Sequence, residues 1–168
     1  MSGSKTDGYP RALPTTISAT PRRCRVVILE DDQFLAHCYE MLLQRVSPHV
    51  QILSFTDGDK AWGELSKVDP DLFITDVEHP GRDVWEMLSL LTAEKVTYPI
   101  LMVSGDFVPR ESYQHMYPAL KLTTISKPFD VPVFIKLLTD LLKATDGYMG
   151  ITEQTRPNHT QGGATGLA

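Results

Sequence analysis

The sequence lacks three features that would assign it to a large functional class: a long apolar run, a leader-like amino terminus and an excess of basic residues. A membrane helix needs about 20 consecutive apolar residues, and no stretch approaches that length. Residues 1–21 contain no apolar core of the kind a secretory signal requires, about 7–15 residues long. We therefore expect a cytoplasmic protein that contacts no membrane.

The charge and the cysteine content argue against two further classes, DNA-binding proteins and proteins stabilised by disulfides. The chain has 16 Lys and Arg against 21 Asp and Glu, a formal net charge of −5. DNA-binding surfaces are basic because they displace counterions from phosphates, so we expect no direct DNA contact. There are two cysteines. Cys24 lies where a strand is expected to begin and Cys38 on the apolar stripe of a helix, which predicts reduced, buried thiols in a reducing compartment.

The chain divides into a polar lead, a body and a polar tail. Residues 1–24 and 145–168 have little apolar content and are predicted to be disordered. The body, residues 25–144, is long enough for one ordinary core. A tail of 24 residues is too short for a second domain. We therefore expect one stand-alone domain.

Three apolar runs, 26–29, 72–74 and 100–103, have the continuous hydrophobic character of parallel strands buried on both faces. Runs near 51–55 and 122–126 are more mixed, as edge strands are. Helical patterns separate all five, near 33–46, 58–68, 83–94, 109–117 and 130–144. The pattern predicts an α/β, doubly wound (βα)5 fold with a parallel five-stranded sheet of order 2-1-3-4-5.

Spacing also predicts which helical residues face the core. In the first helix, apolar residues recur at i+4, namely Phe34, Cys38, Leu42 and Val46. In the last helix the expected apolar face comprises Phe134, Leu137, Leu138, Leu141 and Leu142. Trp62 and Trp85 are expected to pack on helices. We expect Asp32 to cap the first helix and His79 to lie in a solvated loop.

Polar residues follow the expected strands where each one ends. Glu30 and Asp31 follow the first, Asp76 ends the third, Ser104 ends the fourth and Lys127 follows the fifth. In an open parallel sheet, ligands bind beyond the carboxyl ends of the strands where the strand order reverses. These five side chains are therefore expected to line one crevice.

The segments 27–32, 74–81, 102–105 and 126–129 resemble those of the receiver domain of two-component response regulators. The resemblance covers essentially the whole body and implies a flavodoxin-like receiver fold. It further implies that Asp76 accepts a phosphoryl group from a histidine kinase, that Asp31 binds Mg²⁺ directly and that Glu30 binds it through water. A cis peptide bond before Pro128 is a habit of that family.

The residues themselves agree with a cation site. Carboxylates about 5 Å apart repel by about 3 kcal/mol per pair at an effective dielectric constant of 20, and a divalent cation relieves that repulsion. Mg²⁺ prefers oxygen ligands and bridges to phosphate. We therefore expect the protein to supply three of its ligands, namely the carboxylates of Asp31 and Asp76 and the backbone carbonyl of Glu78. Lys127 would neutralise charge on the transferring oxygens, and Ser104 would donate its hydroxyl to the bound phosphoryl group.

The expected partners are a histidine kinase or histidine phosphotransfer protein and an effector protein. By fold-level analogy the effector face is formed by residues 110–117, 121–126 and 130–143, with Tyr113, His115 and Tyr117 as candidate contacts. Many receivers carry an aromatic residue at the position of Thr124, so this chain departs there from the pattern of the family it resembles.

Alternative functions share the same residues. The chain could act as a phosphate sink or relay intermediate, or as a phosphorylation-independent docking module. Aspartate-nucleophile phosphatases also combine an aspartate, a Ser or Thr and a lysine, but their acid-base aspartate follows two residues after the nucleophile, where this chain has Glu78. We therefore expect no enzyme beyond self-catalysed phosphoryl transfer and loss. Glu78 and Asp106 are predicted to tune the lifetime of the phosphoryl group.

Overall fold

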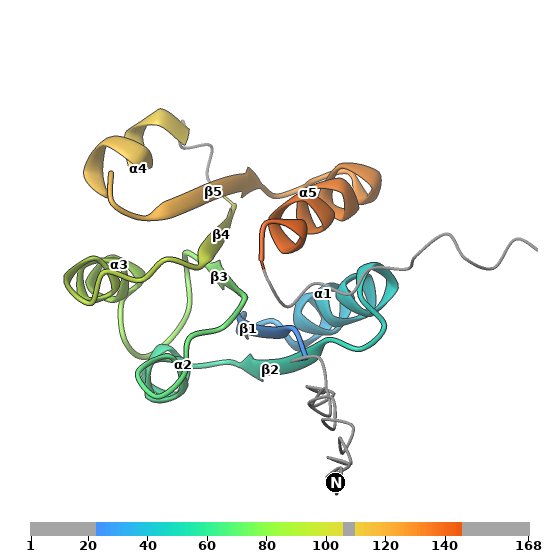
Figure 1. Cartoon of the computed structure of the whole chain (residues 1–168), viewed down its shortest axis with the longest axis horizontal. Helices are drawn as coiled ribbons and strands as arrows, with labels where there is room; N and C mark the ends of the chain where they lie inside the picture. Colours follow the sequence, from blue (N-terminus) through green and yellow to red (C-terminus); the bar gives the residue numbers. More distant parts are fainter. Residues whose placement is uncertain (1–22, 106–109, 146–168) are drawn as a thin grey trace, which may run out of the picture.

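A computed structural model describes residues 23–105 and 110–145, in which strands and helices alternate along the chain (Figure 1). Each element expected from the sequence is present, and the largest shift is at the end of the second helix, which stops at Leu65. The elements are β1 (Arg25–Leu29), α1 (Gln33–Val46), β2 (Gln51–Phe55), α2 (Gly58–Leu65), β3 (Leu72–Asp76), α3 (Val84–Ala93), β4 (Pro99–Ser104), α4 (Arg110–Met116), β5 (Lys121–Ser126) and α5 (Val131–Lys143).

The five strands form one parallel sheet in the order β2-β1-β3-β4-β5, as predicted. The three interior strands, β1, β3 and β4, are buried along nearly their whole length, whereas β2 and β5 at the edges are mixed. This difference follows from the sequence, because an interior parallel strand is covered by helices on both faces. The fold is therefore the predicted doubly wound, flavodoxin-like (βα)5 arrangement.

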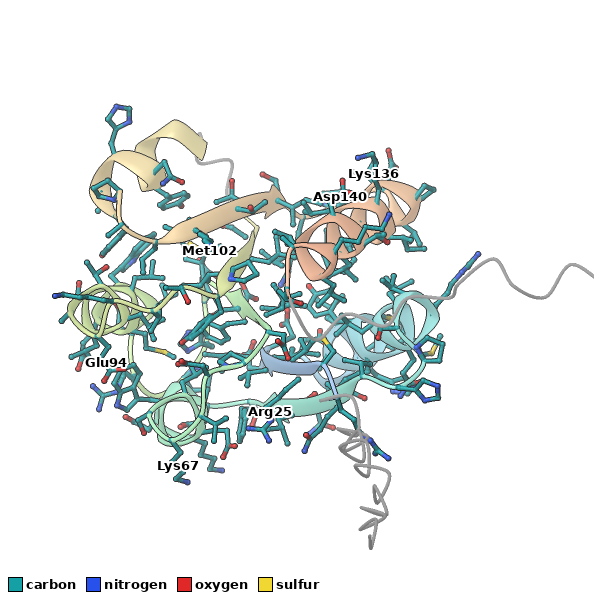
Figure 2. All side chains as sticks on the ribbon, in the orientation of Figure 1. Arg25, Lys67, Glu94, Met102, Lys136 and Asp140 are labelled. Atoms are coloured by element: carbon teal, nitrogen blue, oxygen red, sulfur yellow. The ribbon has the colours of Figure 1, made fainter. Side chains whose placement is uncertain are left out.

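Alternate side chains of each strand enter two different cores. Val26 and Ile28 face α1 and α5, while Val27 and Leu29 face the other side, which α2, α3 and α4 cover. Figure 1 shows the two helical layers on either side of the sheet, and Figure 2 shows side chains filling the space between. Together the two cores fix the carboxyl ends of the strands in place.

The expected face of α1 was partly wrong. Phe34 is 74% exposed and Cys38 is half-buried, although Val46 is buried. The residues of this helix that are buried are Ala36, Tyr39, Leu43 and Val46. A step of four residues advances more than one helical turn, so a strict i+4 series drifts across the helix surface. The core-facing stripe instead follows mixed spacings of three and four.

Other expectations for the helices are confirmed. Phe134, Leu138 and Leu142 of α5 are fully buried, with Leu137 and Leu141 packed against them. The carboxylate of Asp32 accepts hydrogen bonds from the backbone amides of Phe34 and Leu35, so it caps α1. Asp57 and Asp83 cap α2 and α3 in the same way. The helices after β1, β2 and β3 thus start at defined residues.

Cys24 is buried and Cys38 half-buried, and both are free thiols. Within the described part of the chain, no helix is long and apolar enough to cross a membrane. The predicted disordered segments lie almost wholly outside the described residues, as does Asp106.

Candidate phosphoryl-acceptor site

Strand register brings the predicted polar residues to one edge of the sheet. Leu29 pairs with Thr75, so the residues that follow β1 lie beside Asp76 at the end of β3. Asp76 in turn pairs with Val103, and Ser104 pairs with Ser126 immediately before Lys127. The carboxyl ends of four strands therefore meet at this edge, as the strand order requires.

Three carboxylates form a cluster there. One oxygen each from Glu30, Asp31 and Asp76 lies within 4.8 Å of the others. Glu30 is 1% and Asp76 is 7% exposed, whereas Asp31 is exposed. The cluster thus combines two buried acids with one that reaches solvent, and we call Glu30, Asp31 and Asp76 the acidic cluster.

Lys127 bridges the two buried acids. Its Nζ atom donates to Asp76 Oδ2 at 2.6 Å and to Glu30 Oε2 at 2.9 Å. The backbone amide of Lys127 donates to the carbonyl oxygen of Ser104 at 2.7 Å, which extends the pairing of β5 with β4. The bond between Lys127 and Pro128 is cis, as the receiver resemblance implied. The lysine is therefore held at the strand end with its ammonium over the acids.

The orientation of Asp76 is fixed by the residues on either side of it. The backbone amide of Val77 donates to Asp76 Oδ1 at 2.6 Å, and that of Glu78 lies 3.4 Å from the same oxygen. The hydroxyl of Thr75 donates to the carbonyl oxygen of Asp76 at 2.7 Å. Each carboxylate oxygen of Asp76 thus has its own donor, because Lys127 serves the second.

Glu30 has partners that the sequence reasoning missed. The hydroxyl of Tyr39 donates to Glu30 Oε2 at 3.3 Å, and the backbone amide of Asp32 donates to Oε1 at the same distance. Tyr39 is 1% exposed. A buried tyrosine hydroxyl usually finds a hydrogen-bond partner. The sequence signal for this contact was therefore Tyr39 itself, which lies about two turns into the helix that follows Glu30 and Asp31.

The protonation behaviour of the site reflects burial first and then its surplus of negative charge. Burial raises the pKa of Glu30, with the charge of Asp76 acting in the same sense and Lys127 opposing it. Burial alone would lower the pKa of Lys127, but the hydrogen bonds and charges of Asp76 and Glu30 outweigh it and raise the pKa. Burial and the charge of Glu30 likewise raise the pKa of the Tyr39 hydroxyl. Each shift favours holding a proton.

The donor set fits a hard divalent cation. Three carboxylates and one ammonium leave a net formal charge of −2 at the edge of the sheet. Oxygen donors on a partly exposed cluster suit Mg²⁺, which keeps several of its waters. Glu78, whose backbone carbonyl is the further predicted ligand, is an exposed residue of the loop that follows Asp76. The predicted cation set is therefore compatible with the residues that the fold assembles.

The remaining predicted site residues lie nearby. Ser104 is half-buried at the end of β4, next to the backbone of Lys127. Thr124 is half-buried on β5 and shares the face of Leu122 by strand alternation. The switching role of Ser104 stays a prediction.

His79 differs from the sequence expectation. It is half-buried rather than solvated, and its Nε2 atom is buried without a hydrogen-bond partner among the described residues. Its Nδ1 atom lies 3.1 Å from the carbonyl oxygen of Pro80. The reason is that the loop of His79 packs against α2 instead of extending into solvent.

The aromatic residues outside the site mainly pack. Trp62 and Trp85 contact the core, as predicted. Tyr113 stacks on Trp85 with ring centroids 5.2 Å apart, and the hydroxyl of Tyr117 donates to the carbonyl oxygen of Trp85 at 3.2 Å. Of the three candidate contacts on and after α4, His115 is the exposed one. Two of the three predicted contact residues therefore pack inward.

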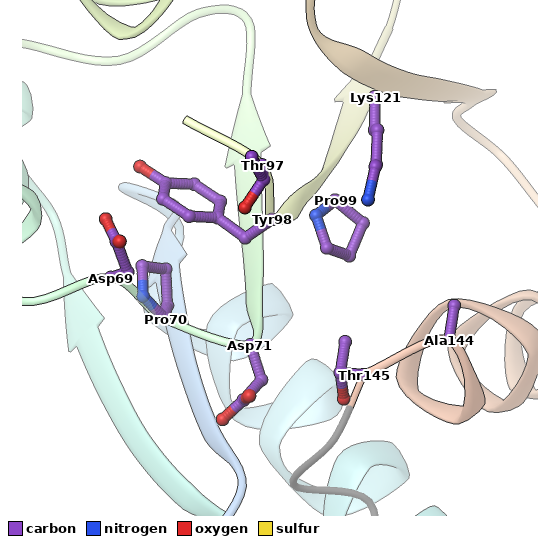
Figure 3. Close-up of a pocket in the computed structure, with 9 residues that line it drawn as sticks. All are labelled: Asp69, Pro70, Asp71, Thr97, Tyr98, Pro99, Lys121, Ala144 and Thr145. Atoms are coloured by element: carbon purple, nitrogen blue, oxygen red, sulfur yellow. The ribbon is translucent and has the colours of Figure 1, made fainter. Parts of the chain in front are cut away.

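A separate pocket of about 310 Å³ opens at the amino-terminal edge of the sheet, opposite the acidic cluster. Figure 3 shows its lining, in which Asp69 and Asp71 lie across from Lys121. One oxygen of Asp71 accepts a hydrogen bond from the backbone amide of Arg25 at 2.7 Å. The pocket shares no residue with the acidic cluster.

Comparisons with known proteins agree with the geometry. Residues 26–139 match the family described as response regulator receiver domain. Curated relatives include the cell cycle response regulator CtrA of Brucella ovis and that of Brucella abortus, each 34% identical over 82 residues. The match covers 48% of this chain and 34% of each relative. The chain thus spans about a third of the length of these relatives.

Similar solved structures support the fold. The signal receiver domain of a putative LuxO repressor protein from Vibrio parahaemolyticus has a TM-score of 0.63 at 17% identity, covering 73% of this chain and 92% of that one. The chemotaxis response regulator CheY4 of Vibrio cholerae has a TM-score of 0.60 at 20% identity, covering 72% and 100%. Because the family match spans most of the chain, this protein belongs to the response regulator receiver domain family.

Proposed function

We propose that the chain accepts a phosphoryl group onto Asp76 from a histidine kinase or a histidine phosphotransfer protein, and that this changes its binding to a protein partner. The observation that supports the proposal most strongly is the ammonium of Lys127, which lies 2.6 Å from Asp76 Oδ2 beside the acidic cluster. Phosphoryl transfer needs a nucleophile and a fixed positive charge beside it, and the Asp76 carboxylate and the Lys127 ammonium supply these at one edge of the sheet.

In the proposed step, an Asp76 carboxylate oxygen attacks the phosphorus of a phosphohistidine. An oxygen–phosphorus bond forms, the phosphorus–nitrogen bond breaks, and the imidazole leaves with the electron pair and takes up a proton. Lys127 neutralises charge on the transferring oxygens, and the hydroxyl of Ser104 donates to the attached group. When bound to the acidic cluster and the carbonyl of Glu78, Mg²⁺ would supply further positive charge on the same oxygens.

The proposed output is a change in protein binding through α4, β5 and α5, with catalysis limited to the chain's own phosphoryl transfer and its hydrolysis. Direct DNA binding is not part of the proposal, because the formal net charge is −5. A cytoplasmic location and action as a stand-alone domain remain predictions.

Two other functions use the same site. A phosphate sink or relay intermediate would need the same chemistry without a switched partner. A phosphorylation-independent docking module would need no phosphoryl transfer. The ion pairs of Lys127 with Asp76 and Glu30 favour the functions that use phosphoryl transfer over the docking module. Incubating the phosphorylated chain with an unphosphorylated histidine phosphotransfer protein distinguishes relay from switch, because relay returns the label to histidine.

The test is intact mass after incubation with Mg²⁺ and a small phosphodonor such as acetyl phosphate. The wild type is expected to gain the mass of one phosphoryl group, and Asp76→Asn to gain none. Asp140→Asn is the matched control, because Asp140 is an exposed carboxylate on α5 that lies near Pro99 and Lys121, at the amino-terminal ends of β4 and β5. An adduct of unchanged yield on Asp76→Asn would place the acceptor elsewhere.

A further inference from the structure

The loop that follows the proposed acceptor rests on the start of α2. This loop, residues 77–83, contains Glu78 and ends at the capping residue of α3. The backbone amide of Gly58 donates to the carbonyl oxygen of Pro80 at 2.9 Å. Gly81 has φ of 83°, and a Cβ atom there would lie 2.8 Å from the carboxylate of Asp57. We call Asp57, Gly58, Asp59 and Trp62 the α2 seat.

Gly58 is required for the close approach of the loop. A Cβ atom at this position would overlap the carbonyl oxygen of Arg82, lie 2.9 Å from its backbone nitrogen and lie 3.0 Å from Cε1 of His79. Gly63, on the same helix, has nothing within 4 Å of the corresponding position. The two glycines of α2 therefore differ in one respect that can be tested, which is contact with the loop.

Arg82 ties the loop to its surroundings by side-chain contacts. Its Nε atom lies 3.4 Å from Asp59 Oδ1, and its guanidinium carbon lies 5.6 Å from the ring centre of Trp62. Its Nη1 atom pairs with Glu86 on α3. The Arg82 side chain is 26% exposed, whereas Asp59 and Glu86 are 64% and 57% exposed, so the contact with half-buried Trp62 is the best shielded of the three. One residue thus joins the loop to both neighbouring helices.

We propose that Gly58 and Arg82 are positioning residues for the cation site: by holding the 77–83 loop on the α2 seat they set how tightly the acidic cluster and Glu78 bind Mg²⁺. The inference rests on the proposed function and assigns to it two residues outside the cluster. A loop that is already held loses less conformational freedom when one of its groups binds a cation. Groups that orient metal ligands typically change metal affinity by about 10–100-fold when they are removed.

Charge alone predicts that neutralising Arg82 changes the Mg²⁺ affinity in the opposite direction from loss of the loop contact. Replacing Arg82 by a neutral residue removes a positive charge from the neighbourhood of an anionic site. By charge alone, that change strengthens the binding of a cation. Loss of the loop contact weakens it. The sign of the change in Mg²⁺ affinity therefore separates positioning from long-range charge.

The experiment is calorimetric titration of Mg²⁺ into the full chain, without phosphodonor, with thermal unfolding recorded for each variant. Arg82→Met and Gly58→Ala are expected to weaken Mg²⁺ binding by about tenfold at temperatures where each is folded. Gly63→Ala is the matched control and is expected to bind as the wild type does. Asp31→Asn is expected to lose binding. If Gly58→Ala does not fold, Arg82→Met alone decides.

The outcomes are distinguishable. Wild-type binding that Asp31→Asn abolishes, with unchanged affinity in Arg82→Met, overturns the positioning role and leaves the proposed function intact. Tighter binding by Arg82→Met also overturns it, because charge alone would then account for the effect. A wild type that binds no Mg²⁺ would overturn the proposed cation site and this inference with it. A purely structural role would lower thermal stability without moving the affinity.

Discussion

Lys127 Nζ lies 2.6 Å from Asp76 Oδ2, although 51 residues and the whole of β4 separate the two side chains in sequence and in the sheet. The lysine reaches this position because it follows β5 and extends over the end of the intervening strand. Its second contact, 2.9 Å to Glu30 Oε2, joins the end of β1 as well. One ammonium therefore contacts two buried acids of different strands and neutralises only part of their charge.

The first prediction concerns that ammonium. Lys127→Met should lower the free energy of unfolding by about 3 kcal/mol in metal-free buffer, because breaking a buried ion pair leaves its acids uncompensated and the 21% exposure of the lysine side chain places the effect at the low end of the usual range. Urea unfolding with a chelator measures the effect. Lys136→Met is the control, since it breaks the exposed pair with Asp140 on α5, both labelled in Figure 2, and should change stability little. Equal effects of the two substitutions would contradict the bridging role.

The second prediction concerns the exposed member of the acidic cluster. Lys127 pairs with Glu30 and Asp76, and no ion pair of Asp31 is present among the described residues. Asp31→Asn should therefore raise metal-free stability, by about 0.5–1 kcal/mol after solvent screening. The same variant should lose the stabilisation by Mg²⁺, which amounts to about 2.7 kcal/mol at a hundred times the Kd. A metal-free loss of stability in Asp31→Asn would refute the repulsion argument.

The third prediction is a pH dependence. Because burial raises the pKa of Glu30 above its ordinary value of 4.5, the folded chain binds this proton more tightly than the unfolded chain does. Its contribution to stability is present below pH 4.5 and is lost as the pH rises through the folded pKa. Metal-free stability of the wild type should thus fall relative to Glu30→Gln above pH 4.5. Parallel curves from urea unfolding across this range would show that Glu30 is not the group responsible.

The fourth prediction tests the corrected face of α1. Phe34→Ser should change stability by less than about 0.5 kcal/mol, because the side chain is 74% exposed. Leu43→Ala should cost about 2–5 kcal/mol, because Leu43 is fully buried. Thermal or urea unfolding measures both. A large loss on changing Phe34 would restore the face that the i+4 spacing predicted.

Much of the fold could be predicted because the central strands have an unambiguous pattern. Val26 to Leu29 and Leu72 to Ile74 are apolar at every position, which only a strand covered on both faces requires. The face of α1 was harder, because Phe34 and Leu43 are both large and apolar and spacing alone does not rank them. Tertiary packing selected Tyr39 and Leu43 as the centre of that face.

The site shows the same division. Residues at strand ends, such as Asp76 and Lys127, are located by topology, and the structure brings them together as expected. The contact of Lys127 with Glu30 and the hydroxyl of Tyr39 on the same oxygen depend on side-chain reach, which no local pattern encodes. The contact of the 77–83 loop with α2 depends on a close backbone approach at Gly58. No local sequence pattern distinguishes this glycine from the others among the 11 of the chain.

The register between β1 and β3 restricts how this gene can vary in length. Leu29 lies opposite Thr75, and neighbouring residues of a strand point to opposite faces. Deleting or inserting one codon within 72–76 would shift the strand by one residue, so that the side chain of Asp76 would point into one of the two apolar cores. Thr75 or Val77 would then take its place at the edge of the sheet that carries the acidic cluster. Length changes in descendants of this sequence should therefore accumulate in the segments between strands and helices, and the strands themselves should keep their residue count.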